Sequence, residues 1–269
     1  MIRKVINKIE LRLISIKPFL AYLSSKNELI LMNRILTLLL CLGTLTAFAA
    51  KPKHQYIKIK TDMGECIIML YNETPQHRNN IISLVKKGVY NGTLFHRIIK
   101  DFMIQGGDPD SKTAKQGDLL GEGTVGYTVP AEFRDSLFHK KGALGAARDN
   151  NPEKASSGSQ FYIVQGKKFT DQELDALEAN RLNFKIPVWQ REIYKTIGGT
   201  PHLDRNYTVF GEVVKGLDMV DKIAAVSKDS NDRPLADVKM TVSVLKKRTA
   251  KKLEKELAKS IKNESFTIN

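Results

Sequence analysis

The sequence predicts a mainly β domain, and three observations support this fold class. Between residues 94 and 164, short apolar runs alternate with loops rich in Gly, Asp and Asn. Residues 54–70 form two arms of β-branched and apolar residues around a Gly-containing turn at 62–64, which indicates a hairpin. Further strands are expected at 207–214 and 238–245. The pattern is typical of a closed or sandwiched β structure rather than of alternating βαβ units.

Two helices are expected beside these strands. The first follows Thr74, a residue suited to the N-cap, has Pro75 at its first position and stops at Gly88. Between them, apolar residues recur at helical spacing. The second spans residues 217–225. Beyond Lys246, Lys alternates with Glu and Leu, which predicts a solvated helical tail.

Residues 170–199 depart from the β pattern. Thr170 and Glu173 have the spacing of a capping box, and Pro187 suits the start of a second helix. We therefore expect a helical hairpin inserted between two strands. Two roles remain open for its apolar residues: packing on each other and on the rest of the domain, or an exposed face around the tryptophan that binds unfolded chains. These residues are Leu174, Leu177, Trp189 and Ile193.

The charge of the 269-residue chain is concentrated at its ends. Of the formal net charge of +14, residues 1–50 contribute +5 and residues 246–262 contribute +6. The rest of the chain carries only +3, so the segment between these ends lacks the excess charge of a basic groove for phosphates. We expect no nucleic-acid partner.

The first 49 residues are expected to be a signal sequence region, in which translation could start at Met32 rather than Met1. An uncharged run at 35–48 follows Arg34, and Ala47-Phe48-Ala49 resembles a cleavage site. The run is shorter than the roughly 20 residues of a membrane-spanning helix. We therefore expect export to a bacterial periplasm, with no membrane contact beyond the signal sequence; an uncleaved membrane anchor is the alternative.

We accordingly divide the rest of the chain into a folded domain at 50–246, with the insert at 170–199, and a basic tail at 247–269. After cleavage Cys66 would be the remaining cysteine, so no internal disulfide is expected. An alternating apolar stretch surrounds it, which favours a buried structural thiol.

Two further patterns point away from cofactor chemistry. Gly121, Gly123 and Gly126 have dinucleotide-fingerprint spacing, but the required helix cannot continue past Pro130, so we interpret the segment as a surface loop. The histidines have no metal-ligand spacing: they are His54, His77, His96, His139 and His202. We expect neither a metal nor a cofactor.

The most informative stretch is FHRIIKDFMIQGGDP at 95–109. By composition alone it is a strand, a turn and a strand, with Arg97 on the surface. However, the stretch closely resembles the main signature of cyclophilin-type peptidyl-prolyl cis-trans isomerases. GSQFYI at 158–163 and LD at 203–204, followed by YTVFG at 207–211, resemble two more. The resemblance extends over roughly 55–246 and implies a closed eight-stranded antiparallel barrel capped by two helices, interrupted here by the helical hairpin.

The resemblance also implies a site. Arg97 would be catalytic, donating a hydrogen bond to the prolyl nitrogen as the amide twists, and Gln105 would bind the substrate backbone. The proline ring would contact Phe102, Met103, Tyr162 and Leu203. The residues preceding proline would lie along Ala147, Arg148 and Gln160. The remaining substrate-binding positions implied are His96 at the pocket edge, His202 and Tyr207.

Three of these positions depart from the common family pattern. Tyr162 replaces a usual Phe and adds a hydroxyl that needs a partner or solvent. His202 replaces a Trp and Tyr207 a His of well-studied eukaryotic members, which affects the expected pocket shape more than catalysis.

The resemblance implies a cofactor-free isomerase, expected to be a monomer, acting on proline-containing, unfolded or loosely structured exported polypeptides. The alternative is a non-catalytic peptide-binding chaperone on the same fold. Such a binder would be expected to lose Arg97, which this chain keeps.

Overall fold

The computed structural model describes residues 54–267, with side chains described up to residue 260. The expected signal sequence, its cleavage site and the alternative start at Met32 lie outside this range. Within it, no helix combines the length and apolar character needed to cross a membrane. Residues from 54 onward form one compact unit.

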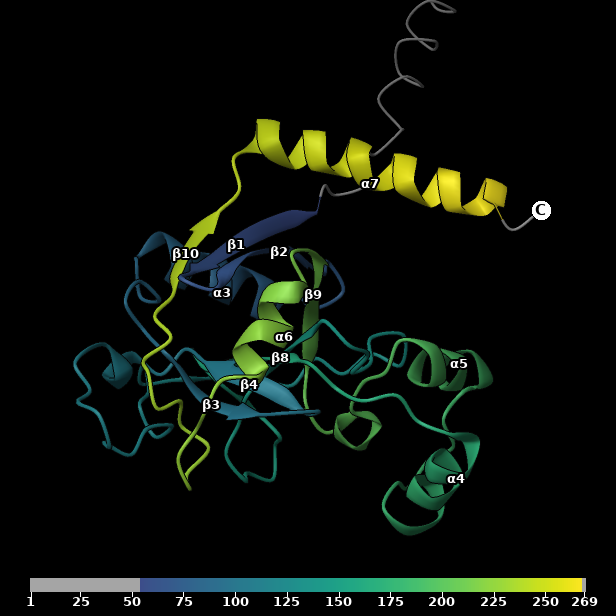
Figure 1. Ribbon diagram of the computed structural model, residues 1–269, viewed down its shortest axis with the longest axis horizontal. Coiled ribbons are helices and arrows are strands. Elements are labelled where there is room, and N and C mark those ends of the chain that lie inside the picture. Colours follow the sequence, from purple (N-terminus) through teal and green to yellow (C-terminus); the bar gives the residue numbers. More distant parts are fainter. Residues whose placement is uncertain (1–53, 268–269) are drawn as a thin grey trace, which may run out of the picture. The chain divides into compact units, whose positions relative to one another are not determined.

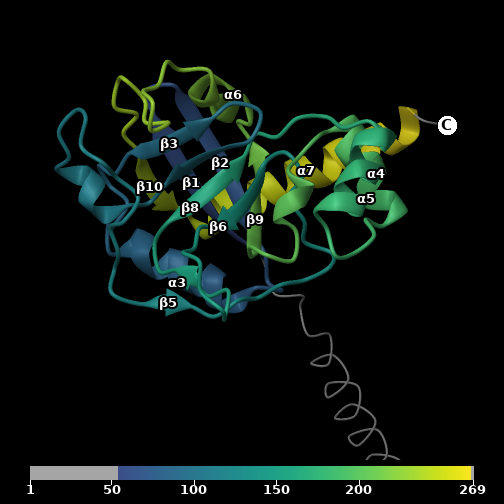
Figure 2. The same cartoon turned by 90° about the horizontal axis from the view of Figure 1, so that it is seen from below.

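The centre of this unit is a curled antiparallel sheet of eight strands (Figures 1 and 2). Its spatial order is β10-β1-β2-β9-β6-β8-β4-β3, and a separate two-stranded ribbon pairs β5 with β7. The strands are β1 (Gln55–Thr61), β2 (Gly64–Leu70), β3 (Phe95–Ile99), β4 (Met103–Gly106), β5 (Thr128–Val129), β6 (Ala143–Ala146), β7 (Ser156–Ser157), β8 (Phe161–Val164), β9 (Val209–Lys215) and β10 (Thr241–Val244). The expected hairpin is present as β1 and β2, paired from Gln55↔Leu70 to Thr61↔Gly64.

The expected closed barrel is wrong, because the edge strands β3 and β10 do not pair with each other. They meet only beside their ends, where Leu94 and Lys239 form an isolated bridge. Farther along β3, the backbone N–H of Ile98 donates to the carbonyl of Asp232. The loop that precedes β10 therefore covers the edge that β10 would have to pair with, and the sheet remains open.

The concave side of the sheet is filled by one apolar core that includes both expected helices. α3 (Pro75–Lys86) contributes Ile81, Ile82, Leu84 and Val85, and α6 (Asp218–Ala224) contributes Met219, Val220, Ile223 and Ala224. Cys66 is a free, buried thiol in the same core, as expected.

The N-terminus of α3 is capped by a residue distant in sequence. Thr74 takes the N-cap position, but its hydroxyl makes no hydrogen bond with any described residue. Instead, the carboxylate of Glu132 accepts from the backbone N–H groups of Gln76 and His77, at 3.1 and 3.0 Å. A carboxylate at this end also complements the helix dipole, so Glu132 replaces the local cap that the sequence predicted.

The inserted hairpin consists of α4 (Asp171–Asn180) and α5 (Val188–Thr196), which lie together at one side of the domain, away from α3 (Figures 1 and 2). The capping box of Thr170 and Glu173 is confirmed. The two helices share a small apolar core of their own, in which Leu174 and Tyr194 are fully buried against Phe138. Trp189 packs its ring edge-on against Phe138 yet remains 50% exposed.

The basic tail forms the long helix α7 (Lys247–Thr267). It is not solvated all round, because Leu253 is buried. Burial of Tyr56, together with the nearby carboxylate of Glu254, raises the pKa of that tyrosine to about 12.

Candidate active site

One row of directly paired residues crosses four neighbouring strands. Arg97 of β3 pairs with Gln105 of β4, which pairs with Tyr162 of β8, which pairs with Gly145 of β6. Directly opposed residues project from the same face of a sheet. The intervening residues, such as Ile104 and Ile163, belong to the apolar core on the other face. The strand register therefore places the guanidinium, the amide and the phenol side by side.

Gly145 allows the tyrosine ring to lie flat on the sheet. A Cβ atom at this position would be 2.3 Å from Cζ of Tyr162 and 2.4 Å from Cε2, far inside van der Waals contact. Tyr162 is buried, and the Tyr207 ring meets it edge-on with centroids 6.0 Å apart. The phenol is thus held between a backbone floor and a second ring.

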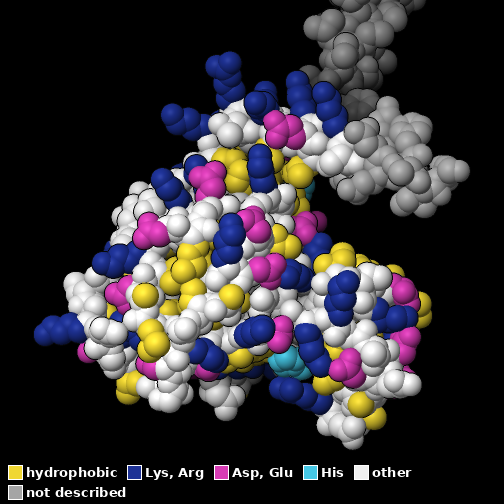
Figure 3. Space-filling model, viewed as in Figure 1, with side chains coloured by type: hydrophobic (Ala, Val, Ile, Leu, Met, Phe, Trp, Pro, Cys, Tyr) yellow, Lys and Arg dark blue, Asp and Glu magenta, His cyan; other side chains and the backbone are white. Residues whose placement is uncertain are grey.

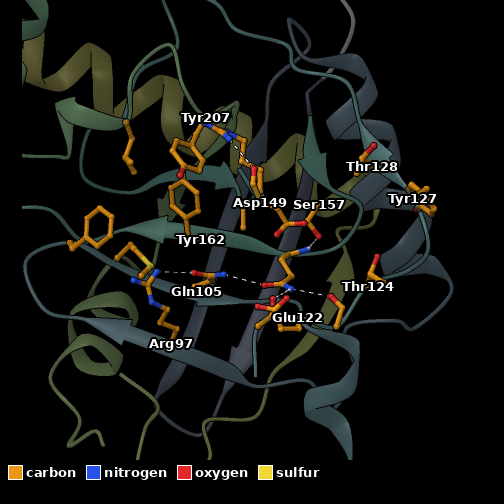
Figure 4. A pocket seen from close by; sticks show the side chains of 18 residues that line it. Arg97, Gln105, Glu122, Thr124, Tyr127, Thr128, Asp149, Ser157, Tyr162 and Tyr207 are labelled. Carbon is orange, nitrogen blue, oxygen red and sulfur yellow. Dashed lines mark hydrogen bonds between the residues drawn. The ribbon is translucent and has the colours of Figure 1, made fainter. Parts of the chain in front are cut away.

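A hollow of about 250 Å³ opens beside this row (Figure 4). All the predicted site residues line it except His96 and His202. Those that line it are Arg97, Phe102, Met103, Gln105, Ala147, Arg148, Gln160, Tyr162, Leu203 and Tyr207. Residues separated by more than one hundred positions in the chain therefore surround one space.

A line of amide hydrogen bonds runs from Arg97 along the floor of this hollow (Figure 4). Nη1 of Arg97 donates to Oε1 of Gln105 at 3.4 Å, and Nε2 of Gln105 donates to Oε1 of Gln160 at 3.1 Å. Gln160 in turn donates to the carbonyls of Gly121 and Gly123, at 2.6 and 3.0 Å. These bonds fix which end of each amide is the acceptor, and they leave Gln105 one further donor and one further acceptor site.

The Arg97 guanidinium retains donors for a ligand. Its side chain is 44% exposed, and its nearest carboxylate among the described residues is Asp232, with Oδ2 3.9 Å from Nε. A guanidinium carries five N–H donors, and the described residues occupy one with a hydrogen bond. Arg97 therefore presents a positive charge and free N–H groups to the hollow.

The segment from Gly121 to Thr128 is the part of the site that the sequence interpretation missed. The buried carboxylate of Asp108 accepts from the backbone N–H groups of Gly121 and Gly123, at 2.6 and 3.4 Å. This clamp brings the glycine loop to the wall of the hollow. The additional lining residues are Gly121, Glu122, Gly123, Thr124, Tyr127, Thr128, Asp149 and Ser157. The one feature of the sequence that could have predicted this contact is Asp108, the acidic residue directly after Gly106-Gly107.

The hydroxyl of Tyr162 finds its partner inside the protein. It lies 2.8 Å from Nε2 of His139, whose Nδ1 lies 2.7 Å from Oδ1 of Asp204. The other carboxylate oxygen accepts from the hydroxyl of Tyr194 at 2.6 Å. All four side chains are buried. A continuous polar chain, the Tyr162–Tyr194 network, thus connects the hollow to α5 of the insert.

The two predicted histidines lie next to the hollow without lining it. His96 is only 3% exposed; burial, reinforced by Arg97 and Arg233 against the opposing effect of Asp108, lowers its pKa to about 4. His202 stacks on Phe102 with ring centroids 5.3 Å apart, and burial together with Arg181 lowers its pKa to about 4. Both rings are therefore neutral at pH 7. The glycine loop lies over His96, since a Cβ atom at Gly121 would be 3.7 Å from its Nε2, and a role for His96 at the pocket edge stays a prediction.

Arg148 forms the far wall. Its guanidinium lies 4.7 Å from the centroid of the Tyr207 ring, and its Nε donates to the carbonyl of Asn206. Within the described residues, no group of three or more His, Cys, Asp or Glu side chains could hold a metal ion. The site thus combines apolar side chains with two arginines and fixed amides.

Comparison with known proteins matches this architecture to one family. The sequence model described as cyclophilin type peptidyl-prolyl cis-trans isomerase/CLD matches residues 56–244. The chain is 35% identical over 186 residues to a protein of Staphylococcus aureus (strain USA300) assigned as a peptidyl-prolyl cis-trans isomerase, covering 68% of this chain and 87% of that one. It is 37% identical over 187 residues to a protein of Streptococcus pyogenes serotype M6 assigned as a bifunctional phosphatase/peptidyl-prolyl cis-trans isomerase, covering 68% of this chain but only 37% of that longer one.

Solved structures agree on the fold. A cyclophilin type peptidyl-prolyl cis-trans isomerase of Cryptosporidium parvum superposes with a TM-score of 0.52 at 21% identity, covering 72% of this chain and 98% of that one. The chain belongs to the cyclophilin-type peptidyl-prolyl cis-trans isomerase family. It is an enzyme of the prolyl isomerase class.

Proposed function

We propose that this domain isomerises X-Pro bonds in unfolded or loosely structured exported polypeptides, with Arg97 as the catalytic residue. The observation that carries the proposal is the pairing of a guanidinium that retains free donors with an apolar hollow and a fixed amide. A second structure of the Cryptosporidium protein, determined in the presence of the dipeptide Ala-Pro, supports a proline-containing ligand for this fold.

The chemistry needs no nucleophile. The barrier to rotation is about 18–20 kcal/mol, because the peptide C–N bond has partial double-bond character. Twisting the amide breaks this conjugation and frees the lone pair of the prolyl nitrogen. A donor at that nitrogen therefore binds the twisted state more strongly than the planar one, and each ~1.4 kcal/mol of such preference gives about tenfold in rate.

The chain supplies each part of this scheme. Arg97 is the donor, a task suited to arginine because its planar guanidinium presents several N–H groups. Phe102, Met103, Tyr162 and Leu203 contact the proline ring, and Gln105 binds the substrate backbone with its remaining donor and acceptor sites. The part of the polypeptide that precedes proline lies along Ala147, Arg148 and Gln160.

The Arg97→Ala variant tests this mechanism in a protease-coupled assay on a proline peptide. We expect at least a tenfold loss in kcat/KM with an unchanged thermal unfolding midpoint, because the side chain is partly exposed and its replacement leaves no buried group unpaired. Arg248→Ala, an exposed position on α7, is the matched control and should keep full activity. Full activity in a folded Arg97→Ala protein would contradict the assigned mechanism, and an inactive wild type would favour a non-catalytic peptide binder.

The exported substrate class rests on the apolar run at 35–48 and on Ala47-Phe48-Ala49. We expect the mature protein to begin at Ala50 and to be recovered from the periplasm of its bacterial host. N-terminal sequencing of the protein from fractionated cells measures this. Cytoplasmic material that begins at Met1 or Met32 would refute export.

A further inference from the structure

A second hollow, of about 720 Å³, adjoins the first. It lies between the β3–β4 turn, the segment that follows β8, and the helix α4, in the region where the space-filling surface is indented between the insert and the rest of the domain (Figure 3). Most of its walls come from residues outside the family's signature stretches. They are Ile99, Asp101, Phe102, Lys167, Phe169, Glu173, Ala176, Leu177, Asn180, Arg181, Gly199, Thr200 and His202.

The two hollows are separated by very little. Phe102 lines both of them. The consecutive residues Leu203 and His202 line the first and the second, respectively, and His202 stacks on Phe102. A chain bound in the first hollow therefore needs to pass only this pair of rings to reach the second.

The second hollow has a mainly apolar floor. Ile99 and Phe169 are partly buried there, and Leu177 of α4 joins them. The floor also contains Thr200, which is buried and whose hydroxyl has no hydrogen-bond partner among the described residues. Because the protein encloses this hydroxyl, the hollow offers a ligand an apolar floor rather than a hydrogen bond from Thr200.

The rim carries one cation without a counterion. The ammonium of Lys167 pairs with Glu173 at 2.8 Å. Arg181 is exposed at the C-terminal end of α4 and has no carboxylate within 4.0 Å among the described residues. Its guanidinium is therefore available to an acidic group at the outer end of the hollow.

We propose that this hollow binds the part of an extended polypeptide that follows the isomerised proline, with an apolar side chain against Leu177 and an acidic side chain at Arg181. The inference rests on the proposed function, which assigns the preceding residues to Ala147, Arg148 and Gln160. Of the two hollows, the second is the one that residues of the insert line. The insert therefore contributes selectivity for the sequence after proline.

Four peptides of one X-Pro core test this. One is short; one is extended after proline by four residues containing Leu and then Asp; one has Lys in place of that Asp; and one carries the Leu-Asp extension before proline instead. With the wild-type protein we expect kcat/KM for the Leu-Asp peptide to exceed that of the short peptide about five- to tenfold, and neither of the other two peptides to reach this gain.

Charge reversal at Arg181 supplies the decisive comparison. In Arg181→Glu the ratio of kcat/KM for the Asp peptide to that for the Lys peptide should invert, whereas Lys251→Glu, an equal charge change at an exposed position on α7, should leave the ratio as in the wild type. Equal kcat/KM for the short and Leu-Asp peptides, an equal gain from the extension before proline, or a ratio insensitive to Arg181 would each overturn the inference. Failure to turn over the short peptide would instead refute the proposed function.

Discussion

Two buried networks in this domain are built from the same three groups, a histidine ring, a carboxylate and a hydroxyl. In the first, Nδ1 of His77 lies 2.7 Å from Oε2 of Glu132 and Nε2 lies 3.0 Å from Oγ of Ser156. In the second, the same two nitrogens of His139 face Asp204 and Tyr162. In both, the carboxylate also accepts a backbone N–H of its own histidine.

The networks differ in what lies at their ends. The first ends on β7 and on the N-terminus of α3, so it ties a helix to a strand within the scaffold. The second ends on Tyr162, which lines the first hollow, and on Tyr194 of the insert. The same three groups thus connect different parts of the molecule: the first network stays within the scaffold, and the second reaches from the insert to the first hollow.

Burial sets the charge states of the first network. It lowers the pKa of His77, with Glu132 acting in the opposite direction. Burial alone would raise the pKa of Glu132. The hydrogen bonds that its carboxylate accepts from the backbone and ring of His77 and from the backbone of Gln76 outweigh burial, so the pKa of Glu132 is lowered. We therefore assign a neutral His77 that donates through Nδ1 to an ionised Glu132.

Glu132→Ala should have the largest effect on stability. It leaves the buried ring and backbone N–H of His77, and the partly buried backbone N–H of Gln76, without this acceptor, and each unsatisfied buried group costs about 1–3 kcal/mol. We expect the free energy of unfolding in urea to fall by about 3 kcal/mol or more, while kcat/KM per folded molecule stays within about twofold of the wild type. Glu132→Gln keeps one acceptor oxygen and should lose less. A selective loss of activity would mean that the first network also serves the site.

Acidification should lower the free energy of unfolding, because buried neutral histidines favour the folded state only while they remain unprotonated. His96 has a pKa of about 4 in the folded protein against 6.5 unfolded, so the unfolded state binds its proton first as pH falls. The stabilisation is full above pH 6.5 and is lost towards pH 4, about 2 kcal/mol between pH 7 and pH 5 from this group. His77 and His202 act in the same direction. Urea titrations at stepped pH measure this. Stability that rises on acidification would contradict the assigned neutral rings.

Tyr162→Phe tests the end of the second network at the site. It removes the hydroxyl and leaves Nε2 of His139 without that partner, which should cost about 1.5 kcal/mol of stability. The ring should stay in place on Gly145, so kcat/KM should fall by no more than about threefold. The measurement is chemical denaturation paired with the isomerase assay. A tenfold loss of activity at unchanged stability would give the hydroxyl a direct role that we do not assign to it.

Tyr194→Phe should have the smallest effect. It removes one hydrogen bond to Asp204, a loss of about 1 kcal/mol, from the network end that lies in the insert. We expect a small rise in KM with kcat unchanged, because Asp204 still holds His139 through its other oxygen. Thr196→Val on the same helix, outside the network, is the control. Identical kinetics in Tyr194→Phe and wild type would show that the network transmits nothing from the insert to the site.

Local signals predicted the elements better than their connections. The hairpin at 54–70, the capping box at Thr170 and the signature residues around Arg97 depend on neighbouring positions in the sequence, and all of them are present. The cap that Glu132 supplies to α3 and the partner of the Tyr162 hydroxyl depend on contacts between segments more than twenty residues apart. No local pattern encodes such contacts.

The same distinction explains one error and one omission. The closed barrel was predicted from the resemblance to the family. It is wrong because the loop around Asp232 covers the edge of β3. The glycine-rich segment was interpreted as a plain surface loop because the carboxylate that clamps it, Asp108, precedes it by more than ten residues. Both outcomes depend on tertiary hydrogen bonds.

The two ends of the insert are hydrogen-bonded to each other, and this shortens the loop that must close when β9 joins the sheet. The backbone N–H of Gly199 donates to the carbonyl of Lys167 at 3.0 Å, and the two residues form an isolated bridge. β8 and β9 are separated by about 44 residues, but once the hairpin has formed, the flexible path between them is shortened to about a dozen. By the logarithmic dependence of loop-closure entropy on length, this lowers the cost of bringing β9 to the sheet by about 1 kcal/mol. A segment added to the chain can in this way assist the assembly into one sheet of the two strands that it separates.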